Sequence, residues 1–188
     1  MTERPPDDEL NLGAVFHDAI VERIRHDGQD VVLTIDHEFV RRHHGFSETH
    51  RFGVRIVRAS SLLVDRFEFP QFPCPPRQGL PHDEQRRIVR EWQAHGCTRS
   101  VSWELFAGAI GNPDVIYDLR SARVVPGGPP GQKTLELYGM LEPEVHGYHV
   151  ELEGRDVTYS SGGAAIGAEA LIALGRAYWD ASRARRPS

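Results

Sequence analysis

The pair Asp27-Gly28 constrains the fold of this chain more than any other feature of the sequence. It separates two runs rich in β-branched residues, IVERIRH at 20–26 and VVLTID at 31–36. Glycine supplies the positive φ that a tight reversal of the chain needs, so the pair predicts a β-hairpin. The hairpin is the starting point from which the rest of the sheet is predicted.

Similar β-rich stretches continue along the chain. In the first run, a period of two predicts that Ile20, Glu22 and Ile24 share one face of the strand. A second hairpin is predicted at 148–160, turning around Gly154. Further strands are predicted, in chain order, at 52–56, 60–69, 100–106, 114–125 and 134–141.

Two segments show helical spacing. At 82–95, Ile88, Val89 and Trp92 lie on one side, and Gly96 is expected to end this helix in a left-handed conformation. The second segment, 164–184, carries an apolar stripe and ends in a run of arginines that suits the negative end of the helix dipole.

Strands grouped into hairpins, with helices set apart, predict an α+β fold. We expect a mostly antiparallel sheet with the C-terminal helix and one internal helix packed on it. Residues 1–11 are expected to form a disordered tail, and 12–188 a single domain. Proline-rich stretches near 70–81 and 126–131 should be loops because proline cannot continue a sheet.

Composition excludes several classes of protein. Of 188 residues, 39% are hydrophobic and 26% charged, which is typical of a globular chain. No apolar run is long enough to span a bilayer, so we expect a cytoplasmic protein without membrane contact. The formal net charge of −5 gives no basic surface for nucleic acid. Cys74 and Cys97 lack metal-ligand neighbours and are expected to be free thiols.

A glycine-rich stretch precedes the C-terminal helix and contains Ser161, Gly162 and Gly163. Backbone N–H groups at a helix start can bind an anion, which makes this a candidate small-molecule or phosphate site. The favoured alternative is that serine caps the helix while the glycines allow close helix–sheet packing. The dinucleotide fingerprint does not fit because no strand follows the helix, and no cofactor is predicted.

Residues 37–50 are polar, irregular and rich in histidine: His37, His43, His44 and His50, together with Glu38. Imidazole and carboxylate groups are ligands for zinc, but the spacing matches no known template. A solvated loop is the favoured interpretation, and no metal site is predicted.

His17 and Asp18 have the residue types of a catalytic relay, in which a carboxylate orients an imidazole base. Adjacent residues in an extended chain point to opposite faces, so a structural role at the entry to the sheet is favoured. No serine or cysteine lies in a nucleophile elbow, and no catalytic residue is assigned. Enzymatic activity therefore stays open.

The segment 15–36, VFHDAIVERIRHDGQDVVLTID, carries a family resemblance. An apolar residue, His-Asp, a small residue and an aliphatic one lead into a hairpin with an acidic or glycine turn. In this the segment resembles the opening of YxiG-like and immunity-protein-like small bacterial proteins. The resemblance implies an α+β fold without established enzymatic activity, and a role in neutralising a partner toxin by direct binding.

Two hypotheses follow. The first is a non-enzymatic interaction protein, which exposed acidic and aromatic residues on one sheet face would support. The alternative is a small-molecule or anion-binding protein, with or without enzymatic activity, that uses the glycine-rich start of the C-terminal helix. The sequence carries no signal for the oligomeric state.

Overall fold

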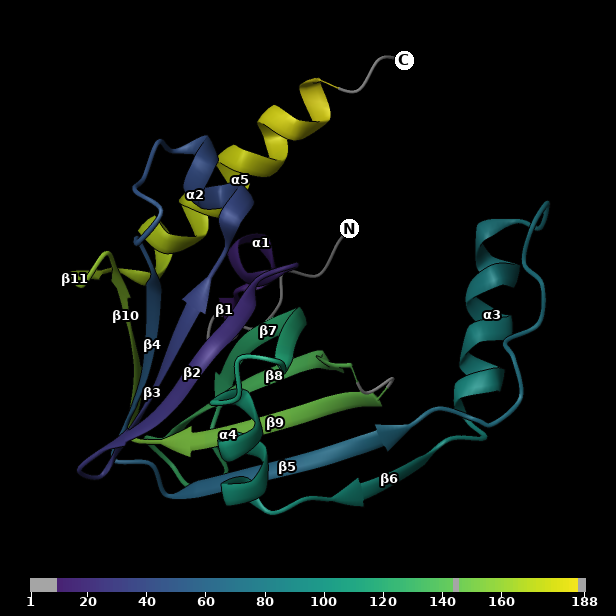
Figure 1. The fold of residues 1–188 in the computed structure, drawn as a ribbon, viewed down its shortest axis with the longest axis horizontal. Helices are drawn as coiled ribbons and strands as arrows, with labels where there is room; N and C mark the ends of the chain where they lie inside the picture. The colour runs from purple at the N-terminus through teal and green to yellow at the C-terminus, as the bar shows by residue number, and fades with distance from the viewer. Residues whose placement is uncertain (1–9, 144–145, 186–188) are drawn as a thin grey trace.

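The computed structural model describes residues 10–143 and 146–185 of the chain. It confirms the α+β prediction: within these residues, five helices accompany eleven strands that pair antiparallel in one sheet (Figure 1). The order across the sheet is β11-β10-β4-β3-β2-β7-β8-β9-β5-β6, and β1 pairs with β7. Among the helices that the structure describes, none is long and apolar enough to cross a membrane.

The elements have the following bounds. The strands are β1 (Leu10–Asn11), β2 (Ile20–Asp27), β3 (Asp30–Asp36), β4 (Phe52–Val57), β5 (Ser61–Glu68), β6 (Cys97–Ser100), β7 (Ile116–Pro126), β8 (Lys133–Glu142), β9 (His146–Gly154), β10 (Asp156–Ser161) and β11 (Ala164–Ile166). The helices are α1 (Gly13–Phe16), α2 (Glu38–His43), α3 (His82–Gln93), α4 (Trp103–Ile110) and α5 (Ala168–Ala184).

The opening hairpin forms between β2 and β3, where Gly28 adopts the expected positive φ of 64°. A β-bulge between Val21 and Arg23 then shifts the alternation along β2. Val21 is buried and Ile20 exposed, and Ile24 pairs with the buried Leu33 on the inner face. The prediction that Ile20 and Ile24 share a face is therefore wrong.

Two bent strands close the sheet into a ring. One bent strand is β4 continuing into β5, and the other is β9 continuing into β10. The two are hydrogen-bonded to each other on both sides of the bend, where β4 pairs with β10 and β5 pairs with β9. At the corner, Arg155 N donates to Val57 O and Ser60 N to Glu153 O, both at 2.8 Å. A Cβ on Gly154 would lie 2.7 Å from Val57 O, so only glycine fits there.

The strands predicted at 148–160 exist, but they do not form a hairpin. β9 pairs with β8 and β5, whereas β10 pairs with β4 and β11. The hairpin prediction fails because the chain does not reverse at Gly154. It continues through the bend at Arg155, from β9 beside β8 to β10 beside β4.

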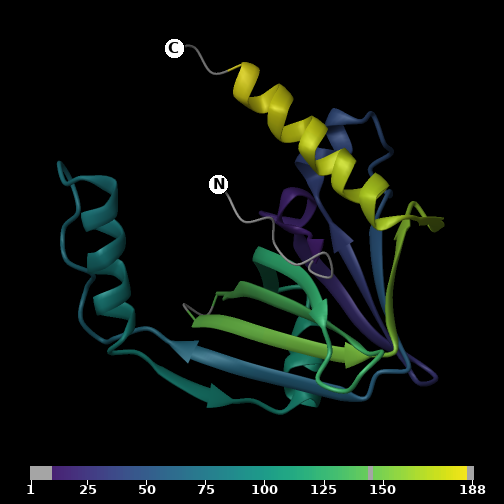
Figure 2. The ribbon, with the colours of Figure 1, turned by 180° about the vertical axis from the view of Figure 1, so that it is seen from behind.

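The core fills the inside of this ring. Side chains at alternate positions, such as Leu33, Val54, Leu137 and Val150, point inward and are fully or almost fully buried. α1 and α5 cover one end, and Figure 2 shows α5 crossing that end of the strands. α4 lies against β2 and β5, and its Phe106 contacts the rings of Tyr117 and Tyr148 on the inner face.

Two elements differ from the sequence prediction. Residues 101–106 belong to no strand. Ser102 Oγ accepts a hydrogen bond from Leu105 N at the start of α4, and this helix buries Trp103, Phe106 and Ile110. Residues 37–50 were expected to be irregular. They contain α2, because the side chain of His37 accepts a hydrogen bond from Val40 N and caps the helix.

The predicted helix over 82–95 forms as α3, but it projects from the body on β5 and β6 rather than packing on the sheet (Figures 1 and 2). The internal helix that packs on the sheet is α4. Gly96 has no positive φ; a Cβ there would lie 2.4 Å from the Phe67 ring, so close approach to β5 explains the glycine.

Residues 70–81 lie between β5 and α3, as predicted. The second loop covers 127–132 instead of 126–131, because Pro126 pairs with Lys133 as the last residue of β7. Most of the tail predicted over 1–11 lies outside the described residues. Leu10 and Asn11 form β1 and pair with Val124 and Arg123.

Candidate functional site

The outward-facing side chains of β7, β8, β9 and β5 form one continuous surface, which we call the acidic face. Cross-strand pairing places Tyr138 between Ser121 and His149, and Met140 between Asp118 and Gly147. The face carries six carboxylates, from Asp65, Asp118, Glu136, Glu142, Glu151 and Glu153.

Two arginines only partly balance these carboxylates. Arg123 Nε lies 2.5 Å from Glu136, and Arg120 Nη2 lies 2.5 Å from Asp118. The described part of the face therefore has a net negative formal charge.

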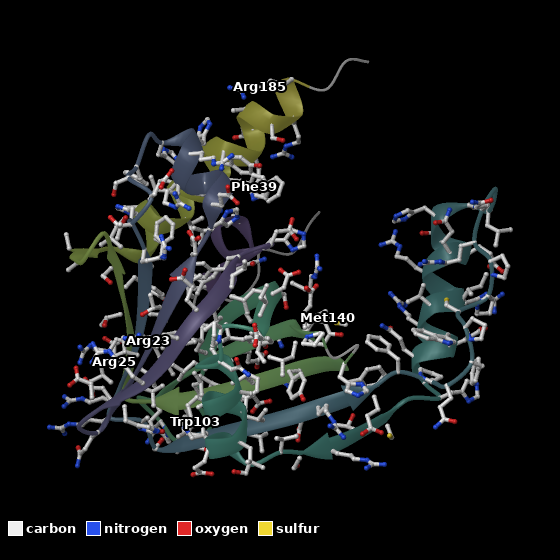
Figure 3. All side chains as sticks on the ribbon, viewed as in Figure 1. Arg23, Arg25, Phe39, Trp103, Met140 and Arg185 are labelled. Atoms are coloured by element: carbon white, nitrogen blue, oxygen red, sulfur yellow. The ribbon has the colours of Figure 1, made fainter. Side chains whose placement is uncertain are left out.

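Aromatic and apolar side chains lie among the carboxylates. The Tyr138 ring lies over Gly147, where an added Cβ would be 2.8 Å from its hydroxyl. A hollow of about 380 Å³ beside it is lined by Arg123, Glu136 and His149, among others. Half-buried Met140 lies toward the end of β8 nearer to α3 (Figure 3).

Exposed aliphatic side chains extend this apolar area. Ile20 and Ile116 are 36% and 38% exposed at the β2–β7 side, and Leu63 on β5 is 40% exposed.

Burial raises the pKa of Tyr138, so its hydroxyl is protonated at neutral pH.

His17 and Asp18 lie at the margin of the acidic face. Asp18 has a left-handed φ of 62°, which brings His17 Nε2 to 3.6 Å from Asp18 Oδ1. The expectation that the two side chains point apart is therefore wrong, because the chain is not extended there.

The contact is nevertheless not a catalytic relay. In a relay the carboxylate accepts from Nδ1, but His17 Nδ1 donates to Arg120 O at 2.8 Å. Arg120 Nη1 donates to Asp18 Oδ1 at 3.0 Å, and its Nη2 contacts Asp118, so Arg120 links His17 and Asp18 to the acidic face. These contacts fix both side chains at the margin of the acidic face.

Asp118 is the carboxylate on this face whose protonation is most clearly perturbed. Partial burial raises its pKa, the nearby carboxylates of Asp18 and Glu142 raise it further, and Arg120 opposes the shift. A positive charge brought close to Asp118 would favour its ionised form.

Ser161, Gly162 and Gly163 do not start the C-terminal helix. The two glycines, with φ of 58° and 85°, form the turn between β10 and β11, and α5 begins only at Ala168. The interpretation that serine caps the helix here is wrong, because the two positive φ values form a hairpin turn. The helix start on which the anion-site interpretation depended lies at Gly167 and Ala168 instead. Ser161 Oγ instead pairs with His50 Nε2 at 2.8 Å.

The histidines of 37–50 have structural contacts. His37 Nε2 donates to His17 O at 2.9 Å, and His44 Nε2 donates to Leu174 O at 2.9 Å. His50 stacks on Phe46 with ring centroids 4.0 Å apart. Across residues 10–143 and 146–185, no three His, Cys, Asp or Glu side chains converge to hold a metal ion.

Sequence reasoning did not identify the acidic face. Its residues lie on four strands, and only the cross-strand register brings them together. One signal was available: in the run TLELYGMLE, Glu136, Tyr138, Met140 and Glu142 recur with a period of two opposite buried leucines.

No protein-family model, curated protein or solved structure matches this chain.

Proposed function

We propose that this protein binds a basic protein partner directly through the acidic face. The observation that carries the proposal is the arrangement of Tyr138 and Met140 among six carboxylates on one exposed sheet face. Acidic and aromatic residues on one sheet face are the feature expected to support the hypothesis of an interaction protein.

The composition of the face supports protein binding. Tyrosine, phenylalanine and methionine are enriched at protein interfaces, and apolar patches with a polar rim mark such sites. Phe67 on β5 joins Tyr138 and Met140, and exposed Ile20 and Ile116 extend the patch. Because these side chains lie on strands, the backbone is already ordered before binding, which removes one part of the entropic cost of association.

The charge of the face supports a basic partner. Opposite charge steers encounter and raises the association rate, while basic side chains on the partner would pair with Glu136, Glu142 and Glu151. The resemblance of 15–36 to immunity-protein-like families agrees with this proposal, with a toxin as the partner. Because Cys74 and Cys97 are both free, we also propose that the protein acts in a reducing compartment such as the cytoplasm.

Affinity capture from the native host with matched variants tests the proposal. The bait is the full chain, compared with Glu151→Lys on the face and Asp180→Lys on α5 as a control. Both carboxylates are exposed, at 39% and 71%. We expect a basic protein to be retained by the wild type and the control and lost from Glu151→Lys. Equal capture by all three baits would contradict the proposal.

A further inference from the structure

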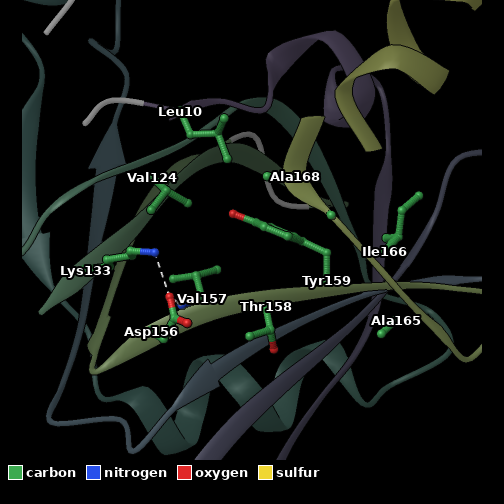
Figure 4. Close-up of a pocket in the computed structure, with 11 residues that line it drawn as sticks. Leu10, Val124, Lys133, Asp156, Val157, Thr158, Tyr159, Ala165, Ile166 and Ala168 are labelled. Atoms are coloured by element: carbon green, nitrogen blue, oxygen red, sulfur yellow. Dashed lines mark hydrogen bonds and ion pairs between the residues drawn. The ribbon is translucent and has the colours of Figure 1, made fainter. Parts of the chain in front are cut away.

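A second hollow lies on the inner side of the ring, away from the acidic face. At the bend where β9 continues into β10, the chain leaves its neighbour β8. A hollow of about 520 Å³ lies there (Figure 4). This volume is in the range of small-molecule sites, about 300–1,000 Å³. Its walls are mainly apolar and come from Leu10, Val124, Val157, Ile166 and Ala168.

Tyr159 provides a polar group inside this hollow. Its side chain comes from the inner face of β10 and is only 9% exposed, and its hydroxyl points into the hollow (Figure 4). Among the described residues, Tyr159 Oη is not one of the buried side-chain atoms that lack a partner, so the hydroxyl faces the open hollow and is available to a ligand. Burial, with a smaller effect of Asp156, raises the pKa of Tyr159 to about 12. The hydroxyl is thus a protonated donor at neutral pH.

A charged pair lies at the solvent side of the hollow. Lys133 Nζ contacts Asp156 Oδ1 at 2.7 Å, and both side chains are about half exposed, at 51% and 46%. Asp156 Oδ1 also accepts from Val157 N at 2.9 Å. The ammonium group has three donors, so Lys133 can serve a ligand while it stays paired with Asp156.

The start of α5 adds to this environment. Gly167 and Ala168 line the hollow, and the first N–H groups of a helix are donors with partial positive charge. The Tyr159 hydroxyl, the Lys133 ammonium and the helix start can all donate hydrogen bonds into the hollow, while the Asp156 carboxylate beside them is already paired with Lys133 and Val157 N through Oδ1. A ligand must supply an apolar body and an acceptor group.

We propose that this hollow binds a medium-chain carboxylate. Its apolar tail occupies the space between β10, β7 and α5. Its carboxylate accepts hydrogen bonds from Tyr159 and Lys133, whose polar ends point toward one another in Figure 4.

Calorimetric titration of the full chain with decanoate, decanol and decyltrimethylammonium tests this site. We expect saturable binding of decanoate to one site per chain, weaker binding of decanol and none of the cation. Tyr159→Phe keeps the ring and should weaken decanoate binding about fivefold, the effect of one lost hydrogen bond. Tyr178→Phe, on α5 and not among the lining residues, is the control and should bind as the wild type does.

Lys133→Met separates the contribution of charge. It should reduce the preference for decanoate over decanol, because the remaining donors, the Tyr159 hydroxyl and the start of α5, carry no full positive charge. Melting temperatures of all variants show whether each is folded. The proposal is overturned by decanoate binding that Tyr159→Phe leaves unchanged, by equal binding of the cation, or by no saturable decanoate binding to the wild type.

Discussion

Gly175 of α5 lies directly against the backbone of Ala14 in α1. A Cβ added to Gly175 would be 2.1 Å from Ala14 O and 2.6 Å from Val15 Cα. Since backbone atoms cannot move aside as a flexible side chain does, α5 can only pack at this distance with glycine. The contact fixes the C-terminal helix over the end of the ring, where its start also lines the inner hollow.

Gly175→Ala should therefore destabilise the fold by about 1–3 kcal/mol, the typical cost of overpacking. Gly108→Ala is the matched control, because Gly108 is an exposed helical glycine in α4 with nothing within 4 Å of the added Cβ. That substitution should stabilise by about 0.5–1 kcal/mol through helix propensity. Urea unfolding of both variants measures the effects, and equal stability of the two would contradict the packing argument.

Stability should fall as the pH is lowered through the range just below about 6.5, the usual pKa of histidine. Burial lowers the pKa of His37, and burial with Arg41 and Arg51 lowers that of His50. The unfolded chain then binds protons that the folded chain does not, so stability is lost from the unfolded pKa down to the folded pKa.

His37→Asn retains a helix-capping residue and removes one of these two groups. Melting curves from pH 8 to pH 5 should show a smaller acid-dependent decrease for this variant than for the wild type. An identical decrease in both would show that His37 is not a source of the pH dependence.

Asp118→Asn should stabilise the protein near neutral pH. The folded-state pKa of Asp118 is raised, so the wild type loses stability as the pH rises from the unfolded value of about 3.9 through the folded value. Asparagine removes this penalty. Denaturation at pH 7 and pH 4 should show an advantage for the variant that shrinks at the lower pH; a wild type that is more stable at pH 7 would contradict it.

Gly147→Ala should weaken partner binding without a large loss of stability. The added Cβ would lie 2.8 Å from the Tyr138 hydroxyl, the far end of a side chain that can move away. The Tyr138 ring would then move away from its position over residue 147, which changes the shape of the acidic face at its centre. Binding of a captured partner, together with the melting temperature, separates this effect from unfolding.

Local features of this fold were predictable from the sequence. Asp27-Gly28 specifies its turn within a few residues, and the helix over 82–95 has its own apolar spacing. Long-range features were not. Whether β9 pairs with β10 depends on the corner at Arg155, which involves residues almost 100 positions away in the sequence.

Dependence on the folded backbone also explains why the predictions for the glycine-rich stretch and for His17 and Asp18 were wrong. The glycines at 162 and 163 fit either a turn or a helix start, and only the pairing of β11 with β10 decides between them. His17 and Asp18 were judged as an extended pair, but the left-handed Asp18 brings them together. Val101, Trp103 and Leu105 alternate as in a strand, which favours the strand prediction. The segment is helical because helical spacing buries Trp103, Phe106 and Ile110 together in the core.

Site-specific photocrosslinking shows whether a partner binds to the acidic face. A photoreactive p-benzoylphenylalanine replaces Tyr138 on the face or, as a control, exposed Thr158 on β10 in the other half of the ring. Illumination in the native host should join position 138, and not position 158, to one basic protein. A crosslink of equal yield from position 158, or none from position 138, would contradict the account.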